Sequence, residues 1–477
     1  MEQMSSELVQ KTIREASDLV ASRKVSSREL TEAILQQIAK TDPLVHAYRT
    51  VMKESALAAA DRADAELAGR GQWRGPLHGI PVGVKDIVYT TDAPTEGGSN
   101  VLKGFVPDHD ATVVKRLRDA GAVIVGKTHT HEFAYGQNIP PTRNAWNPDY
   151  SPGGSSAGSG AAVAARSAFA AIGTDGGGSI RFPAALQGII GLKPTCGRVS
   201  RYGVIPMSAT LDHVGPLART AEDTALVMNV IAGYDPLDVQ SIDEPVPDYT
   251  AGLEDGLRGL RLGVERDYFF YKDVSPEYKK AVEAAIQELQ KLGVTIVDVK
   301  IPELDLCAGI FLNIIATDTS AYHRRWLRDK PQDYSPGTRV MLEFGELIFG
   351  TDYLIAQRAR EVLRSAVKDA FNRHRLDGLV GPSNIVTAVP MTHYSTSLFG
   401  GSPADSTGAL HQLSIANVIG VPSMNVPCGF SSEGLPIGFV LYGRPFEEAL
   451  LLRIGHAYGA ETAWVKRAPE LKAAAVS

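Results

Sequence analysis

The feature that most constrains this chain is a glycine-rich block near its middle, residues 150–195. The block contains SPGGSSAGSG at 151–160 and GTDGGGSIRFPA at 173–184, with an alanine-rich run between them. Such glycine density is typical of backbone that turns tightly or approaches a ligand, because glycine reaches left-handed conformations without a steric penalty. The alanine-rich run predicts a helix that brings the loops of Ser155 and Ser179 close together.

The second loop has the composition of a nucleophile loop. Gly176, Gly177 and Gly178 precede Ser179 and leave backbone amides that no side chain covers, as an oxyanion hole requires. A nucleophilic serine also needs a base, and no G-x-S-x-G motif with a fitting histidine accompanies it. Lys85, in the apolar segment PVGVKD, could take this part, because burial lowers the pKa of a lysine and leaves it able to accept a proton.

The pattern along the chain predicts an α/β protein. Residues 8–69 show helical periodicity, and from residue 77 short β-branched runs alternate with helical stretches, which favours a mixed sheet. Residues 257–300 form one more strand–helix–strand unit, 306–372 read as almost continuous helix, and 376–465 return to strands and loops. We expect residues 1–70 to form an N-terminal helical layer of the same domain. The catalytic domain would then be 71–477, with a helical excursion at about 306–372.

Charge and cysteine content exclude several classes of protein. A net charge of −6 without a basic run argues against nucleic acid as a partner. Cys196, Cys307 and Cys428 are widely spaced and show neither a disulfide framework nor a metal motif. The N-terminal residues lack the apolar run of a secretion signal, and the apolar stretch 161–172 is too short to cross a bilayer. These features predict a cytoplasmic protein without a membrane partner.

Two further motifs match known phosphate-binding and metal-binding patterns, but their sequence context argues against both functions. Gly121–Thr128 matches the phosphate-loop pattern G-x-x-x-x-G-K-[ST], but its middle residues AVIV are typical of a buried strand and not of a phosphate cradle. His129, His131 and Glu132 could together bind a metal, but the spacing offers no further ligand. A polar loop, with the histidines at the surface or rim and Glu132 bonded to backbone, fits them better. We therefore expect no metal and no cofactor.

Taken together, the motifs resemble those of the amidase signature family of serine amidohydrolases. They occur in the family's order, from GIPVGVKD and GKTxxxEFAYG through NPxxSPGGSSAGSGAAVAA and GTDGGGSIRFPAALQGIIGLKPT to NVIGVPSMNVPCG. The similarity covers roughly residues 8–465. It implies a large, mostly parallel mixed β-sheet packed between α-helices on both faces.

The resemblance also implies a Ser-Ser-Lys triad. Ser179 falls on the family's nucleophile, Ser155 on the serine that follows a cis peptide bond, and Lys85 on the general base. Ser155 would pass protons between Lys85 and Ser179, which forms the acyl-enzyme.

The neighbours of the triad have a structural interpretation. Asp175 and Arg181 flank the nucleophile loop, and we expect an ion pair or loop clamp there in preference to a direct role. Ser156, Thr174 and Asp86 are expected to bond backbone in the turns.

The sequence constrains the substrate less tightly than it constrains the catalytic groups. GLKPTCGRVSRYG is similar to the glutaminase A subunit of the tRNA-dependent amidotransferases. There, an acidic residue seven positions before a late Asn holds the amino group of glutamine, and here Leu410 precedes Asn417 at that spacing. An arginine of the matching stretch in that subunit is present here as Arg339, and the sequence leaves open whether Arg339 contacts substrate. A free-standing amidase for a small apolar or aryl amide, with carbamates or esters also compatible, is therefore preferred. The alternative is the glutaminase A subunit.

We expect this enzyme to work on a small-molecule amide as a monomer or homodimer. A protein that carries the triad but mainly binds a ligand is the other class left open. Candidates for the acyl pocket share an apolar or backbone character, although ordinary core packing would explain the apolar ones equally well: Phe133, Tyr135, Gly153, Gly154, Ile205, Met207, Phe344, Phe349 and Leu410.

Overall fold

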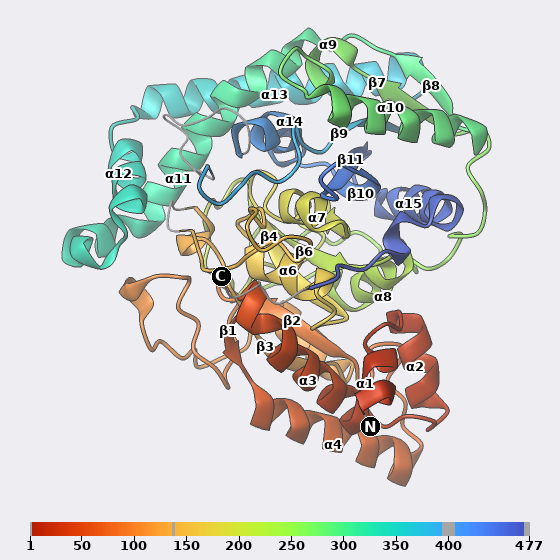
Figure 1. The fold of residues 1–477 in the computed structure, drawn as a ribbon. Helices are drawn as coiled ribbons and strands as arrows, with labels where there is room; N and C mark the ends of the chain where they lie inside the picture. The colour runs from red at the N-terminus through yellow and green to blue at the C-terminus, as the bar shows by residue number, and fades with distance from the viewer. Residues whose placement is uncertain (1, 136–138, 394–405, 472–477) are drawn as a thin grey trace.

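In the part of the chain that the structure describes, one sheet of 11 strands runs through the molecule, and Figure 1 shows its arrangement. The computed structural model describes residues 2–135, 139–393 and 406–471. Along the sheet the strand order is β1-β3-β2-β4-β6-β5-β10-β11-β9-β7-β8. The strands are β1 (Tyr48–Val51), β2 (Pro81–Lys85), β3 (Val123–Thr128), β4 (Ala170–Asp175), β5 (Ile190–Lys193), β6 (His213–Ala218), β7 (Arg261–Val264), β8 (Thr295–Asp298), β9 (Gly378–Pro382), β10 (Ser423–Phe430) and β11 (Pro436–Gly443).

The sheet is mixed, as the sequence predicts, but it is not mostly parallel. Parallel pairs occur in two blocks, β3-β2-β4 and β9-β7-β8. The middle of the sheet, from β4 to β9, is antiparallel throughout, and so is the pair of β1 with β3. The hairpin of β10 and β11 is one reason, because strands joined by a short turn must run in opposite directions.

Helices cover both faces of the sheet. Arg181 on α7 (Arg181–Gln187) donates to Ser423 Oγ on β10. The next residue, Met424, reaches Gly455 on α15 (Glu448–Thr462). Successive side chains of a strand point to opposite faces, so α7 and α15 lie on different sides of β10.

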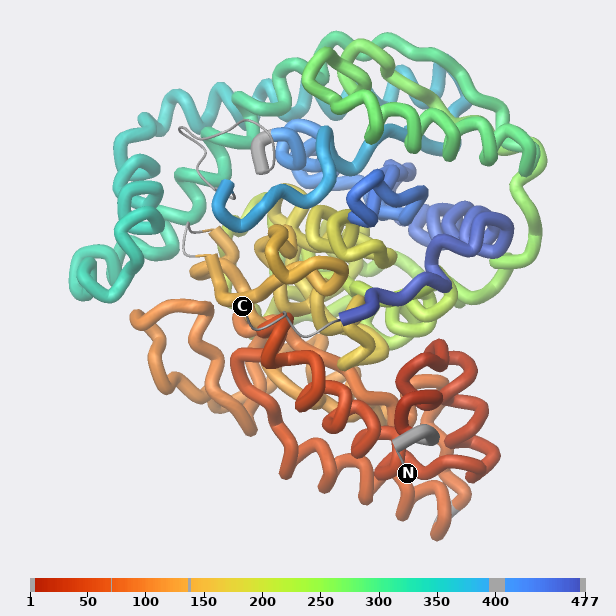
Figure 2. Tube along the Cα trace, viewed as in Figure 1, coloured from red at the N-terminus to blue at the C-terminus, as the bar shows by residue number. Residues whose placement is uncertain are grey.

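The N-terminal segment is mainly helical. It contains α1 (Glu2–Leu8), α2 (Ile13–Ala21), α3 (Ser27–Val45) and α4 (Lys53–Arg70). Ser26 and Glu29, spaced as S-x-x-E, form a capping box at the start of α3. The same segment also carries β1, which pairs with β3 and so joins this layer to the sheet. Figure 2 shows this red segment at one end of the molecule and the green helices at the other.

The predicted strand–helix units are confirmed around α5 and α10. The remaining helices of this middle part are α5 (Thr112–Asp119), α6 (Ala157–Ala164), α8 (Ala221–Ile231), α9 (Arg266–Phe269) and α10 (Pro276–Lys291). The short 3-10 helices of the chain are η1 (Asn100–Leu102), η2 (Glu132–Ala134), η3 (Pro302–Leu306), η4 (Pro331–Asp333) and η5 (Trp464–Lys466). Gly126, Lys127 and Thr128 of the phosphate-loop pattern lie in strand β3, not in a loop.

Three helices follow β8: α11 (Cys307–Asp329), α12 (Pro336–Gly345) and α13 (Gly350–His374). The stretch Pro302–Asp329 is long and apolar enough to cross a membrane, but half of its most apolar part is buried inside the fold, as in a core helix of a globular protein. The C-terminal part differs from the expected strands and loops, because it also contains α14 (Ser406–Ile419) and α15. Their apolar, glycine-containing sequences resemble buried strands when periodicity alone is considered.

Candidate active site

Lys85 is the last residue of β2, and its side chain is fully buried. Its Nζ atom donates to Ser155 Oγ and to Thr174 Oγ1, both at 2.8 Å. Burial lowers the pKa of Lys85 to about 7, although the carboxylates of Asp212 and Asp175 act in the opposite direction. The amine is therefore largely neutral above neutral pH, as the sequence predicts for a buried lysine.

The two serine loops are held together by backbone and side-chain hydrogen bonds. The Ser156 N–H donates to the Ser179 carbonyl at 3.2 Å. The Ser156 hydroxyl donates to the Thr174 carbonyl at 3.1 Å, and the Thr174 N–H returns a bond to this hydroxyl at 3.2 Å. The Gly154–Ser155 peptide bond is cis, as the resemblance implies. The connection from Ser155 to Ser179 is helix α6 followed by strand β4, rather than one helix.

The side chain of Thr174 makes a contact with Lys85 that the sequence pattern did not predict. We expected it to bond backbone, and its N–H instead meets the Ser156 hydroxyl, while its own hydroxyl accepts from Lys85. β2 and β4 are parallel neighbours, with Val84 opposite Ile172. The carboxyl ends of the two strands therefore lie together. The contact of Thr174 with Lys85 depends on this pairing, which the local sequence does not reveal.

Not all three of the glycine amides expected to form the oxyanion hole are available in the structure. The Gly178 N–H donates to Asp175 Oδ1 at 2.7 Å, so this amide already has an anionic acceptor. Gly176 is not among the residues that line the cavity, and a Cβ on it would lie 2.1 Å from Cε of Met207 in the cavity wall. Gly177 and Ser179 line the cavity, and within the described ranges no hydrogen bond engages their N–H groups.

Asp175 and Arg181 form a fully buried ion pair, with Nη2 3.0 Å from Oδ1. Burial alone would raise the pKa of Asp175, but the Arg181 guanidinium overrides burial and holds this pKa well below its usual range. Asn417 on α14 adds a bond from Nδ2 to Asp175 Oδ1 at 2.9 Å and accepts from Arg181 Nη2 at 2.7 Å. Neither charged residue lines the cavity, so their contacts are those of a clamp that holds the loop of Ser179.

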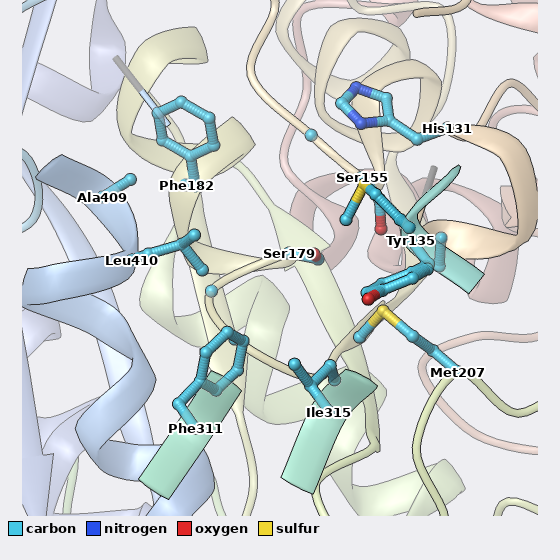
Figure 3. A pocket seen from close by; sticks show the side chains of 15 residues that line it. His131, Tyr135, Ser155, Ser179, Phe182, Met207, Phe311, Ile315, Ala409 and Leu410 are labelled. Atoms are coloured by element: carbon cyan, nitrogen blue, oxygen red, sulfur yellow. The ribbon is translucent and has the colours of Figure 1, made fainter. Parts of the chain in front are cut away.

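The cavity above Ser179 has a volume of about 100 Å³. Figure 3 shows Ser179 between Leu410 and Phe311 on one side and Ser155 and Tyr135 on the other. None of the described residues that line the cavity is an acid, a lysine or an arginine. They are His131, Ala134, Tyr135, Gly154, Ser155, Gly177, Gly178, Ser179, Phe182, Met207, Phe311, Ile315, Met341, Ala409 and Leu410.

Four of the proposed pocket residues therefore line the cavity: Tyr135, Gly154, Met207 and Leu410. Five do not: Phe133, Gly153, Ile205, Phe344 and Phe349.

The reasons for these exclusions differ. Phe133 is buried against His323, with ring centroids 4.4 Å apart. Gly153 faces Pro183, whose Cα would lie 2.8 Å from an added Cβ. Phe349 is 74 % exposed.

The sequence pattern did not predict the cavity-lining residues that lie on distant helices. Phe311 and Ile315 come from α11, Met341 from α12 and Ala409 from α14, while Phe182 lies on α7, which begins two residues after Ser179. Each reads as ordinary helix packing along the chain, and only the folding of these helices over the nucleophile loop makes them pocket residues. Arg339 on α12 does not line the cavity, and its Nε atom lies 3.4 Å from Glu343 Oε1.

His131 differs from the expected surface position, whereas Glu132 bonds backbone as expected. His131 is buried at the cavity wall, and its ring lies against Gly154, where an added Cβ would be 2.3 Å from Nε2. Burial lowers the pKa of His131 to about 3, so the ring is neutral near pH 7. Glu132 accepts from the Ser335 N–H at 3.1 Å and from the Ser99 hydroxyl at 2.6 Å. Over the described ranges no cluster of three or more His, Cys, Asp and Glu side chains could hold a metal ion.

Comparisons with known proteins find similar chains over nearly the whole length of this one. Residues 29–452 match the family described as Amidase. An amidase from Pseudomonas putida is 43 % identical over 98 % of this chain and 99 % of its own length. The A subunit of Glutamyl-tRNA(Gln) amidotransferase from Chloroflexus aggregans is 40 % identical over 96 % of this chain and 98 % of its own. The solved native peptide amidase from Stenotrophomonas maltophilia superposes with a TM-score of 0.84 at 33 % identity, covering 96 % of this chain and 98 % of that one.

Proposed function

The chain belongs to the amidase family of amide-hydrolysing enzymes, and on that premise we propose that it cleaves small apolar or aryl amides through an acyl-enzyme on Ser179. The observation that carries this proposal is the buried 2.8 Å contact between Lys85 Nζ and Ser155 Oγ beside the cavity that Ser179 lines. A base, a relay hydroxyl and a nucleophile are the groups that serine-based acyl transfer needs.

Acylation begins when neutral Lys85 accepts the Ser155 proton. Ser155 takes the proton of Ser179 as the Ser179 Oγ atom attacks the substrate carbonyl carbon. The carbonyl oxygen becomes an oxyanion, which the N–H groups of Gly177 and Ser179 are free to bind. Ser155 then gives a proton to the leaving nitrogen and regains one from Lys85, and the C–N bond breaks to release the amine.

Deacylation repeats these transfers with water. The Ser155 and Lys85 pair removes a proton from the water molecule that attacks the acyl ester, and the proton returns to the Ser179 Oγ atom as the carboxylic acid leaves. Lys85 ends neutral, so the two half-reactions balance without a cofactor or metal.

The cavity wall supports an apolar acyl group. Phe311, Ile315, Met207 and Leu410 surround the nucleophile, and a charged substrate group would find no opposite charge among the lining residues. The side of His131 and Ser155 suits the leaving group, because Ser155 must reach the leaving nitrogen.

The alternative is the glutaminase part of a tRNA-dependent amidotransferase, the kind of enzyme that the name of the Chloroflexus relative describes. Leu410 in the cavity wall argues against it, since a leucine cannot pair with the ammonium group of glutamine.

A turnover screen tests the proposal. The purified protein and its Ser179→Ala variant should be compared, after dialysis against a chelator, on glutamine, aliphatic and aryl amides, anilides and aryl carbamates. Release from apolar amides that depends on Ser179 would support the proposal. Activity on glutamine alone would overturn it and turn the search to a partner protein.

We further propose a cytoplasmic enzyme that acts as a monomer or homodimer on a small molecule, with no nucleic-acid or membrane partner. The net charge of −6 argues against a nucleic-acid partner, and the half-buried apolar region of α11 argues against a membrane span.

A further inference from the structure

A second cavity, of about 540 Å³, lies beside α13 and shares no lining residue with the catalytic cavity. It is bounded by the end of α14, the segment after β5 and the loop that follows β11. None of the described residues that line it is acidic. They are Thr195, Cys196, Ile242, Arg364, Val367, Lys368, Phe371, Ile419, Gly420, Val421, Gly443, Arg444, Pro445 and Phe446.

One face of α13 gives this cavity an amphipathic wall. Arg364, Val367, Lys368 and Phe371 follow the spacing that places side chains on one side of a helix. Val367 and Phe371 are buried, while Lys368 is exposed at the rim. Two cationic groups therefore alternate with two apolar groups along the wall.

The arginines at the cavity are held by backbone. Arg364 Nε donates to the Ile419 carbonyl at 3.2 Å, and Arg444 Nε donates to the Leu376 carbonyl at 3.0 Å. The ion pair of Arg364 with Glu361 lies at the surface, where such pairs contribute little. Both guanidinium groups are thus oriented before any ligand arrives, which reduces the entropy lost on binding.

We propose that this cavity binds a small carboxylate with an apolar body, such as a medium-chain or aryl carboxylic acid. Three cationic side chains and no acidic one favour an anion, and the buried apolar wall favours a hydrocarbon body. Acids of this class are also what hydrolysis of apolar amides would release. That link rests on the proposed function, whereas the binding itself does not.

The chain provides its own reporter for this cavity. The thiol of Cys196 is partly exposed and lines it, whereas Cys307 and Cys428 are buried. The rate at which a disulfide reagent labels Cys196 can be followed without catalytic activity, and mass spectrometry identifies the labelled residue. We expect octanoate at about ten times its Kd to slow this labelling about tenfold, because bound protein is protected. We expect octanol to protect much less.

Two charge-reversed variants locate the carboxylate. Lys368→Glu changes an exposed side chain at the cavity, and Arg358→Glu changes an exposed side chain of the same helix that does not line it. We expect Lys368→Glu to weaken the protection by octanoate at least about tenfold and Arg358→Glu to leave it within about twofold. Absence of protection, equal protection by octanol, or equal losses in both variants would each overturn the proposal. None of these outcomes depends on the proposed amidase activity.

Discussion

The Nζ atom of Lys85 lies between two hydroxyl groups, with Ser155 Oγ and Thr174 Oγ1 each 2.8 Å away. All three side chains are buried. Both of these hydrogen bonds are to neutral partners, so burial dominates and the pKa of Lys85 falls to about 7. The same geometry orients the amine toward Ser155.

This pKa predicts how activity depends on pH. Only neutral Lys85 can accept a proton, so kcat/KM should fall as pH drops below about 7, by about tenfold per pH unit, and should level off above it. The measurement is kcat/KM between pH 5 and 9 on a neutral amide, with circular dichroism at each pH as a control for folding. A flat profile over this range would contradict the assignment of Lys85 as base.

Replacing Ser179, the proposed nucleophile, should abolish turnover. Ser179→Ala removes the only atom that forms the proposed acyl ester, so we expect kcat to fall at least about a thousandfold. Labelling by a fluorophosphonate probe should disappear as well. Ser365→Ala, at an exposed serine of α13, should leave both readouts unchanged. A Ser179→Ala enzyme that kept more than about a thousandth of the rate would show that another residue is the nucleophile.

Thr174 is predicted to position the base. Thr174→Val removes the hydroxyl that holds Lys85 Nζ, and the loss of about one hydrogen bond should lower kcat about tenfold. Thr174→Ser keeps a hydroxyl and should restore most of the rate. The pH profile separates a positioning role from a packing role, because only loss of the Lys85 contact should move its apparent pKa.

Leu410 should control which amides are accepted. Leu410→Asp places a carboxylate in the wall of the catalytic cavity, so we expect kcat/KM for an apolar amide such as phenylacetamide to fall at least about tenfold. Phe349→Asp makes a similar change at a residue that is 74 % exposed and should have no effect. If both variants retained full activity on phenylacetamide, the acyl group would bind elsewhere.

Asp175 should matter for stability more than for chemistry. Asp175→Asn leaves the buried Arg181 guanidinium without its counter-charge, and the free energy of unfolding should fall by about 3–5 kcal/mol. The pKa of Asp175 is lower in the folded protein than its ordinary 3.8, so its contribution is complete above that pH and is lost as the pH falls further. Denaturant titrations of both proteins at pH 7 and pH 3 measure these effects, because only the lower pH lies below 3.8. A variant as stable as the wild type would contradict the clamp.

Several features were determined by local sequence. The capping box of Ser26 and Glu29 and the strand nature of the segment before Lys127 depend on neighbours in the chain, and the structure has both. The buried end of a short strand likewise predicted a lysine with a lowered pKa at position 85. These properties follow from residues that are close in sequence, so a sequence pattern can reveal them.

Other features depend on contacts that no local pattern contains. The contact of Thr174 with Lys85 requires the parallel pairing of β2 with β4. Phe311 is a pocket residue because α11 packs over the nucleophile loop, whereas Phe349, which has a similar character in the sequence, points to solvent. The amino-acid sequence by itself determined the chemistry of the site, since the reactive groups and the glycines that expose them are covalent properties of the chain. Only the tertiary structure decided the shape and polarity of the cavity, because its walls come from helices far apart in sequence that long-range packing brings together.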